Sequence, residues 1–217
     1  MGLDSGYVAR TGFLPKDGLI WVDTCGIQFC GRCDKENDRI RNLRAQRISE
    51  FYGEFKRRGN IATTQGVLGE LQTNVNFYER KKRNLIGWKK ENKGASFRRK
   101  QSCSSSVESC AELIKAYNQM RNVLGRGVHN EVLSGVLPDD IRKFVGNFKP
   151  SYDRKLSGTD KDLVLRALFS GDGSGVLTAD VPMMEVYISG AKNFGFKDSF
   201  VYNSIEDRVF HLDDWRG

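Results

Sequence analysis

A short apolar run, Gly18-Leu19-Ile20-Trp21-Val22-Asp23-Thr24, ends on a carboxylate. Four consecutive apolar residues followed by an acid predict a buried strand that is covered on both faces, as in a parallel sheet. In open α/β sheets ligands bind outside the carboxyl ends of the strands, which is where Asp23 would lie. One such acid more often just ends a strand or caps the next helix, so Asp23 gains significance only if other acids follow other strands.

The composition indicates one globular domain. A chain of 217 residues can bury a sizeable core, and we expect a single domain over residues 1–217. No segment reaches the ~18 apolar residues of a membrane span. Residues 1–17 contain no apolar run that could serve as a secretory signal. Five cysteines, an odd number, in a chain without such a signal indicate reduced thiols and a cytoplasmic protein.

The positive charge is concentrated in one segment. Residues 80–100 contain ten Lys and Arg and one acid, Glu91, a net +9 against +8 for the whole chain, so the remainder sums to −1. A solvated or disordered loop is one interpretation. The other is a surface that follows a phosphate backbone, because aromatic residues that could stack on bases are interleaved. The residues assigned to nucleic-acid binding on this second interpretation are Lys81, Lys82, Arg83, Trp88, Lys89, Lys90, Lys93, Arg98, Arg99 and Lys100.

Helices flank a short strand in the first half of the chain. Apolar residues at helical spacing predict a helix from about Asp34 to Arg58, and residues 60–64 predict a second strand. The next helix begins near Gln65. Glu70 lies on the flank of its apolar stripe, where it could face solvent or reach over the carboxyl edge of the sheet. The run 102–106, Ser-Cys-Ser-Ser-Ser, predicts a linker that ends where a further helix starts.

The second half contains two acids at the start of one helix. Residues 139–148 predict a short helix closed by Pro150, and residues 157–162 introduce another. At about 100° per residue Asp160 lies beneath the apolar stripe of that helix. Asp162 points away from the stripe and is spaced for a solvent-side ion pair with Arg166. Asp160 could cap the helix, although Ser157 or Thr159 could do so instead; an acid turned toward the core needs a partner, and a metal ion is one.

The opening pattern then recurs. Residues 175–180, Gly-Val-Leu-Thr-Ala-Asp, predict a short apolar strand that ends on Asp180, and a helix follows. Residues 200–202 and 208–212 predict a final edge strand or hairpin.

Strands that alternate with helices predict an α/β fold, a three-layer sandwich with a central, mostly parallel sheet. Two of the acids would lie at strand ends and two near helix starts, facing one crevice; they are Asp23, Asp180, Glu70 and Asp160. Clustered carboxylates repel one another, and an all-oxygen donor set favours Mg²⁺ or Mn²⁺ as the bound cation. Two such ions about 3.5–4 Å apart would activate a water and stabilise the leaving oxygen of a phosphodiester.

At this point the chain resembles the PIN-domain family of metal-dependent nucleases. Four pieces in order carry the resemblance: Val22-Asp23-Thr24, Val67-Leu68-Gly69-Glu70-Leu71, Thr159-Asp160 with its following helix, and Leu177-Thr178-Ala179-Asp180. They cover roughly residues 19–74 and 157–212. The resemblance implies a PIN-like fold and carboxylate-held Mg²⁺ or Mn²⁺ that cleaves RNA, sometimes structured DNA. Carried over, the catalytic and metal-binding acids are Asp23, Glu70, Asp160 and Asp180, with Asp162 as a competitor of Asp160 and with Thr24 and Thr178 as accessory polar residues.

The spacing between two of the acids is longer than in the compact family pattern. Asp160 lies 90 positions after Glu70, and residues 79–104 are predicted to be a basic inserted segment. Cys30 and Cys33 form a CxxC pair, but a structural zinc site normally takes four ligands, commonly from two such pairs. The second pair is missing, so zinc is disfavoured.

The sequence therefore predicts a metal-dependent endoribonuclease with RNA as its partner. Two alternatives stay open: a structure-selective DNA nuclease of the same fold, and a nucleic-acid-binding protein that does not cleave. No membrane partner is expected, and a homo-oligomer or a protein partner is left open.

Overall fold

The computed structural model describes residues 14–15, 17–28, 36–126, 138–151 and 155–214. Five strands form one sheet in the order β2-β1-β3-β4-β5. The strands are β1 (Ile20–Val22), β2 (Ile61–Ala62), β3 (Gly175–Thr178), β4 (Phe200–Asn203) and β5 (Arg208–His211). All neighbouring strands are parallel except β4 and β5, which form the antiparallel hairpin expected at the C-terminal edge. The prediction of an α/β fold with a mostly parallel sheet is confirmed.

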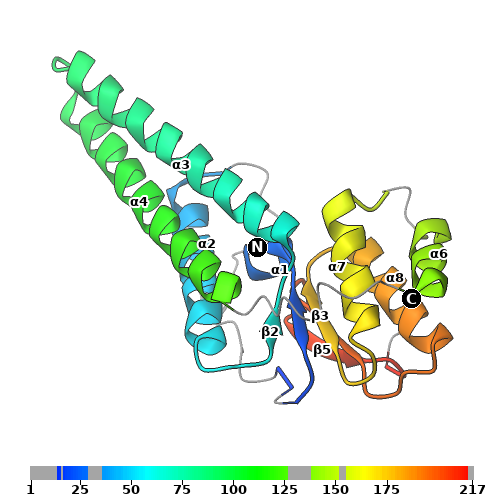
Figure 1. The fold of residues 1–217 in the computed structure, drawn as a ribbon. Helices are drawn as coiled ribbons and strands as arrows, with labels where there is room; N and C mark the ends of the chain where they lie inside the picture. The colour runs from blue at the N-terminus through cyan, green and yellow to red at the C-terminus, as the bar shows by residue number, and fades with distance from the viewer. Residues whose placement is uncertain (1–13, 16, 29–35, 127–137, 152–154, 215–217) are drawn as a thin grey trace.

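Helices cover both sides of the sheet in three layers (Figure 1). One layer contains α1 (Thr24–Gln28), α2 (Asp38–Phe55), α3 (Gln65–Glu91) and α4 (Phe97–Arg126). The other contains α6 (Asp139–Asn147), α7 (Gly158–Phe169) and α8 (Val181–Asn193). No helix within the described ranges is long and apolar enough to cross a membrane.

Strand β1 is buried on both faces, as its apolar run predicted. Ile20, Trp21 and Val22 are at most 1% exposed. The indole Nε1 of Trp21 donates to the hydroxyl of Ser170 at 2.9 Å, so the one polar atom of this side chain is satisfied in the core. β1 is thus an inner strand of the sheet, with β2 on one side and β3 on the other.

The strand order creates a switch point between β1 and β3. From β1 the chain moves to β2 on one side, and after four helices of the described chain it returns to β3 on the other side. Connections that leave in opposite directions open a crevice at the carboxyl ends of the two strands, where open α/β sheets bind their ligands. Asp23 directly follows β1, and its backbone N–H donates to the carbonyl of Leu177 in β3 at 3.0 Å.

The basic segment is helical, which corrects two predictions. Residues 80–91 form the outer end of α3, and residues 97–100 begin α4, so this segment is no disordered loop. The run 102–106 is no linker either, because α4 continues through it to Arg126. Tertiary contacts override the low helix propensity of serine: Ser106 donates to Asp38 at 2.8 Å, and Arg41 donates to Ser109 at 2.9 Å. The predicted insertion 79–104 is thus the outer part of a helical hairpin, which Figure 1 shows projecting from the body.

Smaller differences concern element ends. Helix α2 begins at Asp38, where the side chain of Asn37 accepts a hydrogen bond from the N–H of Ile40, and it ends at Phe55 rather than near Arg58. Strand β2 is limited to two residues. Cys30 and Cys33 lie outside the described residues.

Candidate functional site

Four carboxylates from distant parts of the chain line one pocket. Asp23 and Asp180 enter it from the ends of β1 and β3, and Glu70 and Asp160 enter it from the first two turns of α3 and α7. The cavity holds about 400 Å³, and its remaining lining is polar or small: Thr24, Cys25, Gln28, Thr73, Asn74 and Ser157. The structure therefore brings together the four acids that the sequence singled out.

Asp23 is the most buried of these acids, at 3% exposure. Thr178 donates its hydroxyl to Asp23 Oδ2 at 2.8 Å, and the thiol of Cys25 donates to the same oxygen. Burial raises the pKa of Asp23 from 3.8 to about 6, against the lowering effect of these two donors. The charges of Asp160 and Glu70 add to the rise. Above pH 6 the pocket therefore holds a buried negative charge that a cation would stabilise.

Thr178 links the two strand-end acids. Its hydroxyl donates to Asp23 and accepts the backbone N–H of Asp180 at 3.0 Å. This double contact fixes Asp180 at the N-cap of α8, one strand away from Asp23. Asp180 is 8% exposed. The predicted accessory position at Thr178 is therefore in direct contact with the site.

Thr24 lies at the first position of α1 and is 4% exposed. Its hydroxyl oxygen finds no hydrogen-bond partner in the part of the chain that the structure describes. A buried hydroxyl without a partner is costly, so this atom is suited to a ligand or an ordered water in the pocket that Thr24 lines.

Asp160 has two roles in the geometry. Its Oδ2 accepts the N–H of Ser157 at 2.8 Å, and the hydroxyl of Ser157 accepts the N–H of Asp160 at 3.1 Å. This reciprocal pair is a capping box at the start of α7. Asp160 and Ser157, which the sequence offered as alternative caps, thus cap the helix together. Asp160 is half-buried and also lines the pocket.

Asp162 is excluded from the pocket lining. Its Oδ1 accepts a hydrogen bond from Arg166 Nε at 3.0 Å, four residues along α7, as its spacing predicted. The lining of the pocket includes Asp160 and omits Asp162. The helical phase therefore separates the two acids as expected.

The walls of the pocket meet closely at the starts of α3 and α7. A Cβ atom added to Gly66 would lie 2.8 Å from Thr159 Cγ2 and 2.9 Å from Thr159 Oγ1, closer than side chains normally approach. Thr64, which caps α3 by accepting the N–H of Val67, fixes the helix in this position. Glu70 and Asp160 follow directly from these two helix starts, so the contact at Gly66 lies next to the two turns that present these carboxylates.

The donor set suits a hard divalent cation, since carboxylate, hydroxyl and amide oxygens dominate the lining. Within the described residues no group of three or more His, Cys, Asp or Glu side chains converges closely enough to hold a metal ion as the side chains stand. The acids thus surround the pocket without forming a closed ligand cage.

Several lining residues were not predicted. Thr73 and Asn74 lie three and four residues after Glu70, so the same helical turn that presents the acid also presents them. Helical phase could have found both. The contact of Cys25 with Asp23 depends on the short α1 turn and has no signal in the sequence.

Comparison with protein-family models, with curated proteins and with solved structures gave no match. The functional assignment therefore depends on the pocket and its surroundings.

Proposed function

We propose that this chain is a metal-dependent endoribonuclease of PIN type. One observation supports the proposal above all: four carboxylates, separated by up to 157 positions in the sequence, line one pocket at the switch point of a parallel sheet. The ion pairs between described residues do not include Asp23, Glu70 or Asp160.

Each acid has a separate task on this proposal. Asp23 and Asp180 provide the rigid part of the cation site, since Thr178 contacts both and the two parallel strands fix their separation. Glu70 and Asp160 close it from the facing helices. When bound, Mg²⁺ or Mn²⁺ lowers the pKa of water and neutralises the charge of a phosphodiester.

Asp23 couples this site to pH. With a pKa of about 6, its carboxyl group loses its proton when a cation enters or when the pH rises above 6. Thr178 and Cys25 keep its Oδ2 oriented through their hydrogen bonds. The nuclease should therefore gain activity as the pH rises through 6.

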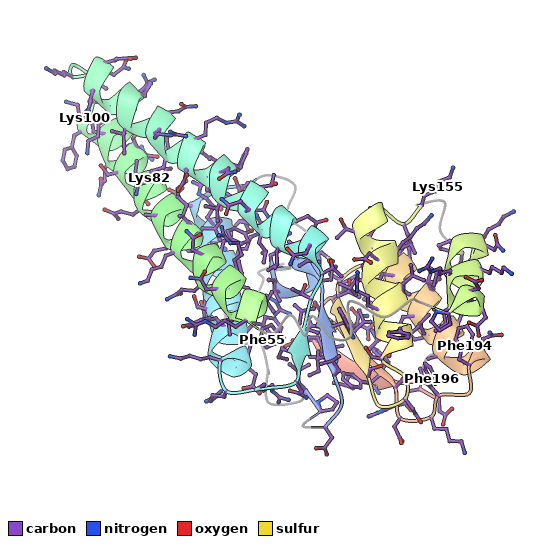
Figure 2. All side chains as sticks on the ribbon, viewed as in Figure 1. Phe55, Lys82, Lys100, Lys155, Phe194 and Phe196 are labelled. Atoms are coloured by element: carbon purple, nitrogen blue, oxygen red, sulfur yellow. The ribbon has the colours of Figure 1, made fainter. Side chains whose placement is uncertain are left out.

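The outer hairpin supplies positive charge for the substrate. Six of its basic side chains are exposed and form no ion pair with any residue in the described ranges: Arg80, Arg83, Lys90, Lys93, Arg98 and Arg99. Figure 2 shows the side chains of this region, with Lys82 and Lys100 labelled on the hairpin. Lys81 and Lys89 are engaged locally, with Glu36 at 2.6 Å and with Ser104 at 2.8 Å. The six exposed residues are thus available to contact a phosphate backbone, whereas Lys81 is held in one place and could contact only a phosphate that passes beside it.

The proposal is tested by incubating the protein with end-labelled RNA and with DNA of the same sequence. Parallel samples contain Mn²⁺, Mg²⁺ or EDTA, and Asp23→Asn and Asp180→Asn serve as inactive controls. Cleavage of RNA that requires the metal and both acids supports the proposal. Cleavage of structured DNA alone would support the DNA nuclease instead, and binding without cleavage in every sample would leave a nucleic-acid-binding protein.

A further inference from the structure

One face of α3 extends outward from the pocket. Residues spaced by three and four positions share a helix face, and from Glu70 this spacing leads along a single stripe. Its members are Glu70, Asn74, Phe77, Lys81, Asn84 and Trp88. The first two line the pocket. The stripe is distinct from the buried face of α3, which consists of Val67, Leu71, Val75 and Tyr78.

Phe77 is the unusual member of this stripe. It is 45% exposed and lies one turn beyond Asn74, about 10 Å along the helix axis from Glu70 at 1.5 Å per residue. Its ring contacts Tyr78 edge-on with the centroids 5.0 Å apart, which fixes its orientation. A large apolar ring that is exposed and held beside a polar pocket is a candidate surface for stacking.

A cation lies over one face of this ring. Lys81 Nζ is 5.8 Å from the centroid of Phe77, and Glu36 holds it there with an N–O distance of 2.6 Å. Glu36 also contacts Arg41 and Arg44, at 3.5 and 3.4 Å. Among the described residues this cluster joins Arg41, Arg44 and Lys81 to two carboxylates, those of Glu36 and Asp38. The ring therefore adjoins a cation that an ion pair holds in place.

We propose that a single-stranded nucleic acid leaves the pocket along this face of α3, with one base stacked on Phe77 and the adjacent phosphate near Lys81. An aromatic platform next to a cation is the combination that binds single strands with little dependence on sequence. Beyond Phe77, α3 carries further exposed basic residues, Arg83 and Lys90, toward the tip of the hairpin. The inference rests on the proposed nuclease function for the position of the scissile bond, but the strand-binding face can be tested without cleavage.

The test measures binding in EDTA, where metal-dependent cleavage cannot occur. A labelled, unstructured RNA of about 12 nucleotides, a length within the site sizes of such proteins, is titrated with parent, Phe77→Leu, Phe77→Tyr and Ile86→Ala proteins. Leu keeps an apolar side chain but removes the ring, and Tyr keeps the ring. Ile86 is 36% exposed on another face of the same helix and serves as the matched control.

We expect Phe77→Leu to weaken binding of the single strand by roughly 5- to 100-fold, the range for loss of one stacked base. Phe77→Tyr and Ile86→Ala should stay within about twofold of the parent, and DNA of the same sequence should show the same pattern. A blunt duplex should bind Phe77→Leu and parent equally, because its bases are not available for stacking.

Three binding results would overturn the proposal: the parent does not bind the single strand, Phe77→Leu binds it as tightly as the parent, or Phe77→Leu loses affinity for the duplex as much as for the single strand. A fourth is a sedimentation result in which the parent is a dimer and Phe77→Leu is a monomer while their affinities for the single strand are equal. The last would identify the ring as a contact between two copies of the chain. Cleavage with Mn²⁺ is measured separately, so a failure of the nuclease function and a failure of this binding face give different results.

Discussion

Replacing Asp23 with Asn should stabilise the metal-free protein at neutral pH. The folded protein holds the Asp23 proton up to about pH 6, whereas the unfolded chain loses it near 3.8. Between these values the folded state binds more protons, so the free energy of unfolding falls as the pH rises. At 1.36 kcal/mol per pKa unit the difference amounts to about 3 kcal/mol at pH 7. Asn carries no charge and can still accept the hydrogen bond from Thr178.

The expected gain is about 1–3 kcal/mol at pH 7.5, or a Tm increase of roughly 3–10 °C for a chain of this size. At pH 4 the gain should shrink below about 1 kcal/mol, because the Asp23 carboxyl is then protonated in the folded parent. Urea unfolding in EDTA at both pH values measures it. Asp162→Asn is the control, since its half-exposed ion pair with Arg166 should change stability by no more than about 0.5 kcal/mol.

Adding Mn²⁺ should make the parent more stable than Asp23→Asn, because a cation that binds only the folded parent stabilises it by mass action. A fall of more than about 1 kcal/mol for Asp23→Asn in EDTA at pH 7.5 would refute the reasoning. Asp23 would then be a structural acid whose charge the fold requires.

Three other predictions concern the neighbours of Asp23 and the substrate. Asp160→Asn should abolish cleavage while keeping the helix cap, because the amide oxygen can still accept the Ser157 N–H. The cleavage rate of Asp162→Asn should stay within a few-fold of the parent in the same assay. If Asp162→Asn lost cleavage and Asp160→Asn kept it, Asp162 would belong to the site in place of Asp160. Cys25→Ala removes a donor that lowers the pKa of Asp23, so the pH at which activity reaches half its maximum should rise. An unchanged or lower midpoint would show that the thiol does not act on this acid. Replacing Lys90, Lys93 and Arg99 with Gln should reduce the dependence of log K on log salt by about 2, at ~0.7 per phosphate contact on a single strand. Equal slopes for parent and triple variant in a salt titration would show that these charges do not contact the substrate.

Local sequence patterns predicted the parts of the site that depend on local structure. The apolar runs before Asp23 and Asp180 specify two strands that end on acids, and the parallel sheet then places both at one edge. The phase of α7 separated Asp160 from Asp162 because both positions belong to a single regular helix.

The remaining features depend on contacts between distant segments. The serine-rich run 102–106 is helical because α4 packs along α2 and α3, with Ser106 bonded to Asp38, and no local propensity indicates this. The thiol of Cys25 also contacts the hydroxyl of Thr178 at 3.3 Å, a contact between residues 153 positions apart. Phe77 has the hydrophobicity of a core residue, and only the packing of α3 shows that its ring stays exposed.

A glycine allows two helix starts at the edge of the pocket to approach closely. Where the starts of α3 and α7 touch, Gly66 has no side chain, and the hydroxyl and methyl groups of Thr159 occupy the space that one would take. A larger residue at position 66 would require Thr159, the neighbour of Asp160, to shift without altering either acid. The position of Asp160 relative to Glu70 can therefore be probed at a residue that does not itself line the pocket.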